Sequence, residues 1–144
     1  MPRFTIALAC CIACAACSHA STSGSTSSAA RAGTVNGAEA SVGARVFETN
    51  CSSCHQASGA GMPGTFPPLA GNPVADGPAS AIIHIVKDGL NGPITVNGTS
   101  YNGVMPHWAG TLSTDDIAAV ITYVRSSWGN HGSAVTPAQV AATH

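Results

Sequence analysis

The chain has 144 residues, of which only 8% are charged, and its five lysines and arginines nearly balance six acidic residues. A chain of this length ordinarily forms one domain. The sequence has neither the basic stripe that nucleic-acid binding requires nor a lysine cluster that would steer a strongly acidic partner, and we expect neither type of binding.

Residues 1–20 have the features of an export signal. Arg3 gives a positive start, and residues 4–16 are apolar but too few to cross a bilayer as a mature helix. Two cleavage sites compete, because Ser18-His19-Ala20 suits an ordinary signal peptidase, whereas Cys14-Ala15-Ala16-Cys17 resembles a bacterial lipobox. We therefore expect an exported, periplasmic protein that is either soluble or anchored to the membrane by a lipid on Cys17.

Residues 21–35 are rich in Ser, Thr, Gly and Ala and predict a flexible linker. A folded domain is predicted over 36–144, and the sequence does not decide whether the tail after residue 130 belongs to it. Apolar side chains at helical spacing predict a first helix over 38–50. Gly43 lies inside it, where glycine costs about 1 kcal/mol relative to alanine. This glycine is either simply tolerated or marks the close approach of another backbone.

The motif Cys51-Ser52-Ser53-Cys54-His55 follows, and C-x-x-C-H is the attachment signature of a c-type haem. One helical turn brings both thiols, Cys51 and Cys54, to the edge of the macrocycle and places His55 as a ligand of the iron. A structural zinc site would need a second paired cluster of ligands, and a redox C-x-x-C would need a βαβ setting. The sequence offers neither, so we predict one covalently attached haem c.

Glycines and prolines between residues 59 and 71 predict a long ordered loop without regular structure. A haem edge would give this loop something to pack on, with Phe66 and Leu69 as its apolar wall. A ligating histidine usually donates its other ring N–H to a carbonyl. The carbonyl of Pro67 or of Pro68 is expected to accept that hydrogen bond from His55.

Asp76-Gly77-Pro78 marks a helix start and Gly89 its end, with Ile82, Ile85 and Val86 on the buried face. Between residues 91 and 103, three Asn-Gly pairs surround a short β-prone run. A small hairpin is therefore predicted before residue 104.

The second axial ligand must come from a loop well downstream of His55. Met105 qualifies by position, and a thioether favours ferrous iron and raises the reduction potential. Met62 and His107 are its rivals, and bis-histidine ligation by His107 would lower the potential. Tyr101 and Trp108 flank the Met105 segment and are candidates for the haem pocket.

The last strong helix signal begins at Ser113, an N-cap followed by acidic residues in the first turn, and Gly129 is its expected end. Its apolar side chains recur at helical spacing, namely Ile117, Val120, Ile121 and Val124. Thr136-Pro137 is a further start signal, which predicts one more turn in the tail.

Over residues 38–128 the chain resembles a class I cytochrome c with one haem. It is most similar to the branch found as haem c subunits of membrane-bound dehydrogenases and as domains attached to oxidases and copper nitrite reductases. The resemblance rests on the haem motif, the run from Gly64 to Gly71, Tyr101 with Met105-Pro106, and the closing segments Tyr123-Val124-Arg125 and Trp128-Gly129-Asn130.

The resemblance implies an all-α fold of three to five helices around the haem, with the first and last helices crossing near Gly43, Phe47 and Tyr123. It also implies iron held between His55 and Met105, with Pro67 as the partner of His55. The function expected is that of an electron carrier between a dehydrogenase or respiratory complex and a terminal oxidase or reductase, not of an enzyme. The alternative is a haem protein that binds or senses a ligand by displacing Met105.

Overall fold

The computed structural model describes residues 37–144, which form one compact unit. The predicted export signal, its cleavage sites, Cys17 and the linker lie outside these residues and stay predictions. No helix in the described part of the chain combines the length and apolar character needed to cross a membrane.

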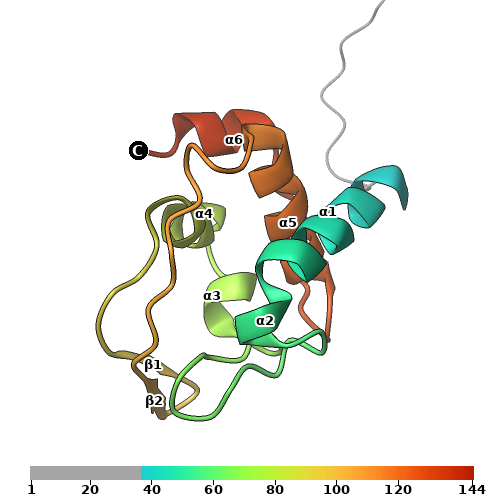
Figure 1. Cartoon of the computed structure of the whole chain (residues 1–144). Helices are drawn as coiled ribbons and strands as arrows, with labels where there is room; N and C mark the ends of the chain where they lie inside the picture. Colours follow the sequence, from blue (N-terminus) through green and yellow to red (C-terminus); the bar gives the residue numbers. More distant parts are fainter. Residues whose placement is uncertain (1–36) are drawn as a thin grey trace, which may run out of the picture. The chain divides into compact units, whose positions relative to one another are not determined.

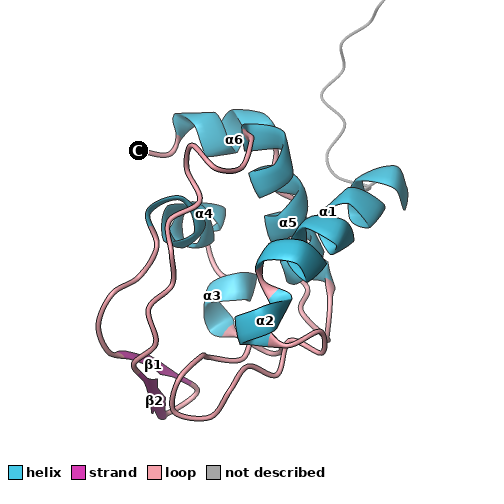
Figure 2. Ribbon diagram, in the orientation of Figure 1, coloured by secondary structure: helices cyan, strands magenta, loops and turns pink. Residues whose placement is uncertain are grey.

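Six helical segments and one two-stranded antiparallel sheet make up this unit (Figures 1 and 2). In chain order they are α1 Gly37–Asn50, α2 Ser52–His55, α3 Pro73–Asp76, α4 Ala79–Asp88, β1 Ile94–Val96, β2 Thr99–Tyr101, α5 Thr114–Ser126 and α6 Pro137–Ala142. Two of the helices, α2 and α3, are single turns. The all-α class with a small hairpin, predicted from the sequence, is confirmed.

Helices α1 and α5 cross at Gly43. A Cβ atom at this position would collide with the backbone carbonyl of Ala119 and lie 2.8 Å from Cβ of Tyr123. Glycine is therefore required by the close approach of the two helices, which decides between the two explanations that the sequence left open.

Three aromatic rings pack together beside this crossing of α1 and α5. The ring centroid of Phe47 lies 5.5 Å from that of Tyr123 and 5.0 Å from that of Trp128, and the last two rings meet edge to face. Such pairs add about 0.5–1.5 kcal/mol beyond their buried area. The cluster fixes the end of α1, from which the haem motif follows directly.

The helix signals are partly confirmed. Ser113 caps α5, because its Oγ accepts the N–H of Asp116 at 3.1 Å. This helix ends at Ser126, not at Gly129 as predicted, because side chains beyond it take over its last carbonyls. Ser127 Oγ donates to the carbonyl of Tyr123 at 2.6 Å, and Asn130 Nδ2 donates to that of Val124 at 2.8 Å.

The single turn α3 was not predicted. Asn72 caps it with its side chain, which accepts the N–H of Val74, and Pro73 stands at the first helical position. Both are ordinary start signals. The helix predicted to start at Asp76-Gly77-Pro78 is α4, which begins at Ala79 with Pro78 as its N-cap and ends before Gly89 as predicted.

The predicted hairpin is formed by β1 and β2, with Ile94 opposite Tyr101 and Val96 opposite Thr99. Asn97 and Gly98 form its turn and both have positive φ, of 50° and 78°. That is the backbone of the two-residue turn that Asn-Gly favours.

The tail forms α6 and continues the core. Val135 and Val140 are 6% and 1% exposed and pack in the same apolar cluster as Ile83 of α4 and Ile121 of α5. A capping box at Thr136 and Gln139 starts the helix, so the predicted extra turn is a short helix.

Candidate functional site: a cavity lined by the Cys-x-x-Cys-His motif and Met105

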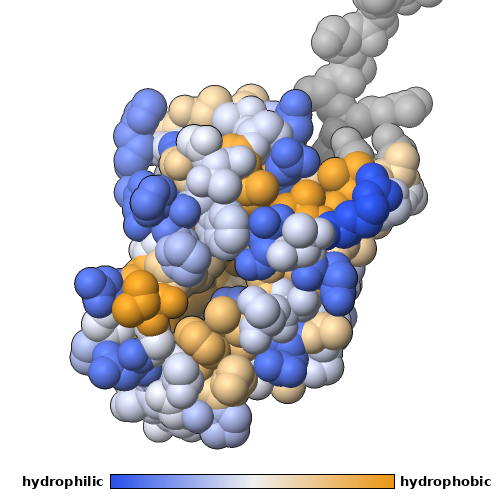
Figure 3. All heavy atoms as spheres, in the orientation of Figure 1, coloured by the Kyte–Doolittle hydropathy of each residue, from blue (hydrophilic) through white to orange (hydrophobic). Residues whose placement is uncertain are grey.

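A cavity of about 190 Å³ opens between the haem motif and the segment around Met105. A second cavity of about 100 Å³ is adjacent to it, because the two share seven lining residues. The shared residues are Cys51, His55, Pro67, Leu90, Ile94, Met105 and Trp108. Figure 3 shows apolar side chains gathered around a hollow in one face of the molecule.

Cys51 lies between α1 and α2, Cys54 lies within α2, and both line the larger cavity. The N–H of Cys51 still bonds to Phe47 O of α1 at 2.8 Å, and its carbonyl accepts the N–H of His55 at 2.9 Å. Both thiols are free and half-buried. Burial, assisted by the neighbouring Cys54, raises the pKa of Cys51 to about 11.

The imidazole of His55 is 8% exposed, and its Nδ1 lies 3.0 Å from the carbonyl oxygen of Pro67. A carbonyl oxygen only accepts, so Nδ1 carries the proton and Nε2 keeps its lone pair. Burial lowers the pKa of His55 and the Pro67 contact opposes this shift. The lowered pKa favours the neutral ring, which leaves Nε2 free to bind a metal.

The loop that presents Pro67 is held by two asparagines that the sequence analysis did not single out for this purpose. Asn72 Nδ2 donates to the carbonyl of Pro68 at 2.7 Å. Asn130 is buried, donates to the carbonyl of Leu69 at 2.8 Å and accepts the N–H of Gly71 at 2.9 Å. These hydrogen bonds hold a loop that has no regular secondary structure. They thereby fix the Pro67 carbonyl, which His55 contacts.

Arg125 is a further buried side chain that supports the site from outside the cavity. Its Nη1 donates to the carbonyls of Ala75 and Gly77 at 2.7 and 2.9 Å, and its Nε donates to that of Ser133 at 2.6 Å. Burial lowers its pKa, and the nearby Asp76 carboxylate opposes the shift. The guanidinium thus joins α3, α5 and the tail.

Met105 lines both cavities and is half-buried. Its backbone pairs with Leu90 through two hydrogen bonds of 3.0 and 2.9 Å. Gly89, with φ of 74°, allows this approach because a Cβ there would collide with the carbonyl of Met105. The turn that ends α4 therefore fixes the position of the Met105 backbone at the cavity.

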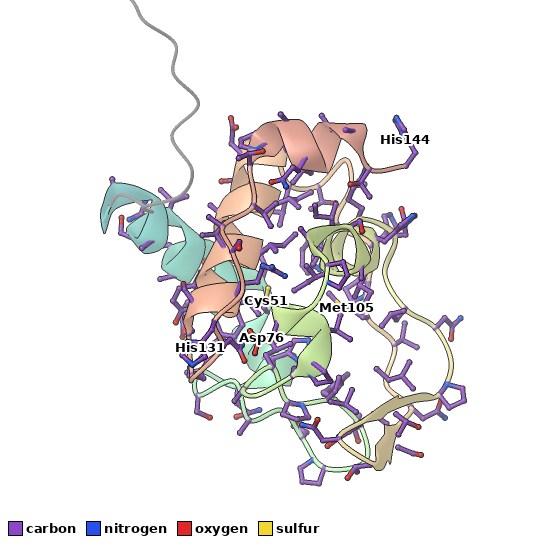
Figure 4. All side chains as sticks on the ribbon, turned by 180° about the vertical axis from the view of Figure 1, so that it is seen from behind. Cys51, Asp76, Met105, His131 and His144 are labelled. Carbon is purple, nitrogen blue, oxygen red and sulfur yellow. The ribbon has the colours of Figure 1, made fainter. Side chains whose placement is uncertain are left out.

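The other predicted pocket residues line one or both cavities, whereas the rival ligands do not. Phe66, Tyr101 and Trp108 line the larger cavity, and Leu69 lines the smaller one. Of the rival ligands, Met62 is 41% exposed and His107 is exposed, and neither lines either cavity. Viewed from behind, Cys51 and Met105 lie toward the middle of the unit, whereas His144 lies at its edge (Figure 4).

The donor set suits a haem c and little else. Two free thiols, a neutral imidazole and a thioether line one slot, and its described lining contains no Asp, Glu, Lys or Arg. Most of the remaining wall is apolar, with Asn50, Ser53, Thr65 and Asn72 as its polar exceptions, and an apolar wall suits the body of a porphyrin. Within residues 37–144, no three or more His, Cys, Asp or Glu side chains are grouped so that they could hold a bare metal ion.

Comparison with known proteins agrees with this chemistry. The family model described as "Cytochrome c" matches residues 40–128. The chain is 40% identical over 92 residues to cytochrome c-552 of Thermus thermophilus, covering 61% of the chain and 69% of that protein. It is 36% identical over 97 residues to the cytochrome c subunit of the quinone alcohol dehydrogenase of Gluconobacter oxydans.

It is also 30% identical over 105 residues to the cytochrome c subunit of the gluconate 2-dehydrogenase of Pantoea cypripedii. The two dehydrogenase subunits are matched over 66% and 72% of the chain. The matched region spans 20% and 24% of those subunits' own lengths, so it corresponds to one part of each.

Proposed function

The chain belongs to the cytochrome c family, and we propose that it carries single electrons from a dehydrogenase or respiratory complex to a terminal oxidase or reductase outside the cytoplasm. Its cofactor is one covalently attached haem c, as in the rest of the family. The haem supplies one-electron chemistry at its iron, and the protein supplies attachment, ligands and surroundings.

Four side chains would hold the cofactor. Cys51 and Cys54 would attach the haem through two thioether bonds, and His55, through Nε2, and Met105, through its sulfur, would hold the iron. The observation that carries this assignment is that His55 and Met105 line the same slot while Met62 and His107 line neither cavity. Pro67 orients His55 and raises its basicity by accepting the Nδ1–H at 3.0 Å.

An iron with two protein ligands has no open position for a substrate, which favours a carrier over an enzyme. The alternative, a ligand sensor, needs a Met105 that leaves the iron readily. Titrating the reduced protein with carbon monoxide separates the two. Weak, slow binding supports the carrier, and rapid stoichiometric binding supports the sensor.

The face around the cavity mouth supports docking without charge. The residues that line the larger cavity come from two segments, 50–67 and 90–108, and neither segment contains an Asp, Glu, Lys or Arg. Met62 and Val104 are the exposed large apolar side chains of the described residues, at 41% and 64%. Transient redox contacts are small and rely on such a patch when charge steering is absent.

We propose that partners dock on this surface, with Met62, Pro63, Phe66 and Val104 as its apolar contacts. Similarity to the dehydrogenase subunits supports a dehydrogenase as donor. The features of residues 1–20 support export, with the protein either free in the periplasm or held by a lipid on Cys17. It acts there as a carrier and has no catalytic residues of its own.

The test is to fractionate detergent-solubilised membranes of the source cell for a dehydrogenase that reduces the protein, and to follow the rate across a salt series. We expect little change with salt, because screening weakens only charge-steered encounters. Val104→Asp should slow the reduction several-fold, whereas Ala81→Asp, at an exposed position of α4 that lines neither cavity, should not. A steep fall with salt would exclude the apolar docking surface.

A further inference from the structure

We propose that Lys87 is a positioning residue for the iron ligand Met105. Its side chain bonds α6 to the last turn of α4, and the backbone of that turn and of the residues after it bonds to the Met105 segment. The proposal rests on the proposed function, which makes Met105 a ligand. It adds a role for the C-terminal helix, which lies beyond residue 128, where the match to the cytochrome c family ends.

The first step is the placement of α6. Figure 1 shows it beside α4 and α5, and the three helices contact one another. Val140 of α6 is 1% exposed and belongs to the core cluster that also contains Ile83 of α4. The tail is thus packed as part of the domain.

The second step is the side chain of Lys87. Its Nζ donates to the carbonyl of Val140 at 3.3 Å and to that of Thr143. These groups lie at the C-terminal end of α6, where the last carbonyls lack helical partners and a cation is favoured. One half-buried ammonium therefore closes the end of α6 onto the last turn of α4.

The third step is the backbone of the same turn. The carbonyl of Lys87 accepts the N–H groups of Trp108 and Ala109, each at 3.2 Å, and the carbonyl of Val86 accepts that of Trp108 at 3.1 Å. Just beyond this turn, Leu90 forms its two hydrogen bonds with Met105. The last turn of α4 is therefore held by α6 on one side and holds the Met105 segment on the other.

The consequence is a mechanical link from the tail to the iron ligand. A ligand held by loop backbone stays in place only if the element it pairs with is fixed. Removing the ammonium leaves the end of α4 held to α6 by apolar packing alone, and Met105 should then leave the iron more often without global unfolding.

The test uses the full-length holoprotein, in which imidazole binds ferric iron only when Met105 has left it. Lys87→Met keeps the aliphatic stem and removes the charged donor, and we expect imidazole affinity to rise about tenfold, as for loss of a charge-assisted hydrogen bond. Lys87→Arg, which retains donors, should restore most of the original affinity. Arg45→Met is the matched control, since it removes the same charge from an exposed position on α1.

An unchanged affinity in Lys87→Met, or an equal rise in Arg45→Met, would overturn the proposal. A structural role alone would lower the denaturation midpoint in Lys87→Met while leaving imidazole affinity in native buffer unchanged. If the unaltered protein lacks the weak long-wavelength absorption band of Met-ligated ferric haem, the proposed ligand has failed. If that band is present and Lys87→Met binds imidazole normally, only the role of Lys87 has failed.

Discussion

Replacing Asn130 with alanine tests how the loop that carries Pro67 is held. The substitution removes the donors to Leu69 O and Val124 O, both at 2.8 Å, and the acceptor of Gly71 N–H at 2.9 Å. Leaving partners unsatisfied in a buried site costs about 1–3 kcal/mol per group, and water will reach some of them, so we expect a loss of about 3 kcal/mol. That is a large share of the roughly 5–15 kcal/mol of a typical domain.

The assay is denaturant and thermal unfolding of the holoprotein, where such a loss should lower the melting temperature by about 10–20 °C. The reduction potential should also rise, because a displaced Pro67 carbonyl makes His55 a weaker base. Asn102→Ala, at an exposed loop position, is the control and should change neither quantity. An unfolding free energy within about 0.5 kcal/mol of the unaltered protein, with the same potential, would refute the assignment.

Three further outcomes are expected. Gly43→Ala should lower the melting temperature strongly because its Cβ collides with Ala119, whereas Gly37→Ala, with nothing within 4 Å, should be nearly neutral in thermal melts. Replacing both Cys51 and Cys54 with serine should abolish covalent haem on denaturing gels and most of the fold by circular dichroism, since the porphyrin is a large part of so small a core; a folded, haem-free protein would contradict this. Burial lowers the pKa of His55 below 6.5. The unfolded chain therefore binds more protons than the folded one below pH 6.5, and the free energy of unfolding should fall as the pH drops. Stability that rises on acidification would count against a buried neutral His55.

Local signals in the sequence predicted most of the fold. The N-cap at Ser113, the Asn97-Gly98 turn and the end of α4 before Gly89 all depend on neighbouring residues, and each is confirmed. The missed turn α3 has a start signal in Asn72 and Pro73. The many glycines and prolines just before it predict a loop, so this signal was not interpreted as a helix start.

Long-range contacts could not be read in the same way. Asn130 bonds to residues about 60 positions away, and Lys87 to residues more than 50 positions away. Nothing in their local sequence distinguishes these side chains from solvated ones. The early end of α5 has the same cause, because Asn130 folds back on Val124 and replaces a helical partner.

The site residues stay a prediction, and the sequence supports them unequally. The motif from Cys51 to His55 carries its own geometry, whereas the choice among Met105, Met62 and His107 depends on how distant loops meet. The structure supplies that geometry through the pairing of Leu90 with Met105. It places Met105 in both cavities and leaves Met62 at the surface.

The absorption spectrum of the ferric protein tests most directly whether His55 and Met105 hold the iron. Met105→Ala should abolish the weak long-wavelength band of Met-ligated ferric haem and open the iron to external ligands. Met62→Ala, which alters a methionine outside both cavities, should leave the band and the ligand affinity as they are. Loss of the band in Met62→Ala, with its persistence in Met105→Ala, would contradict the account.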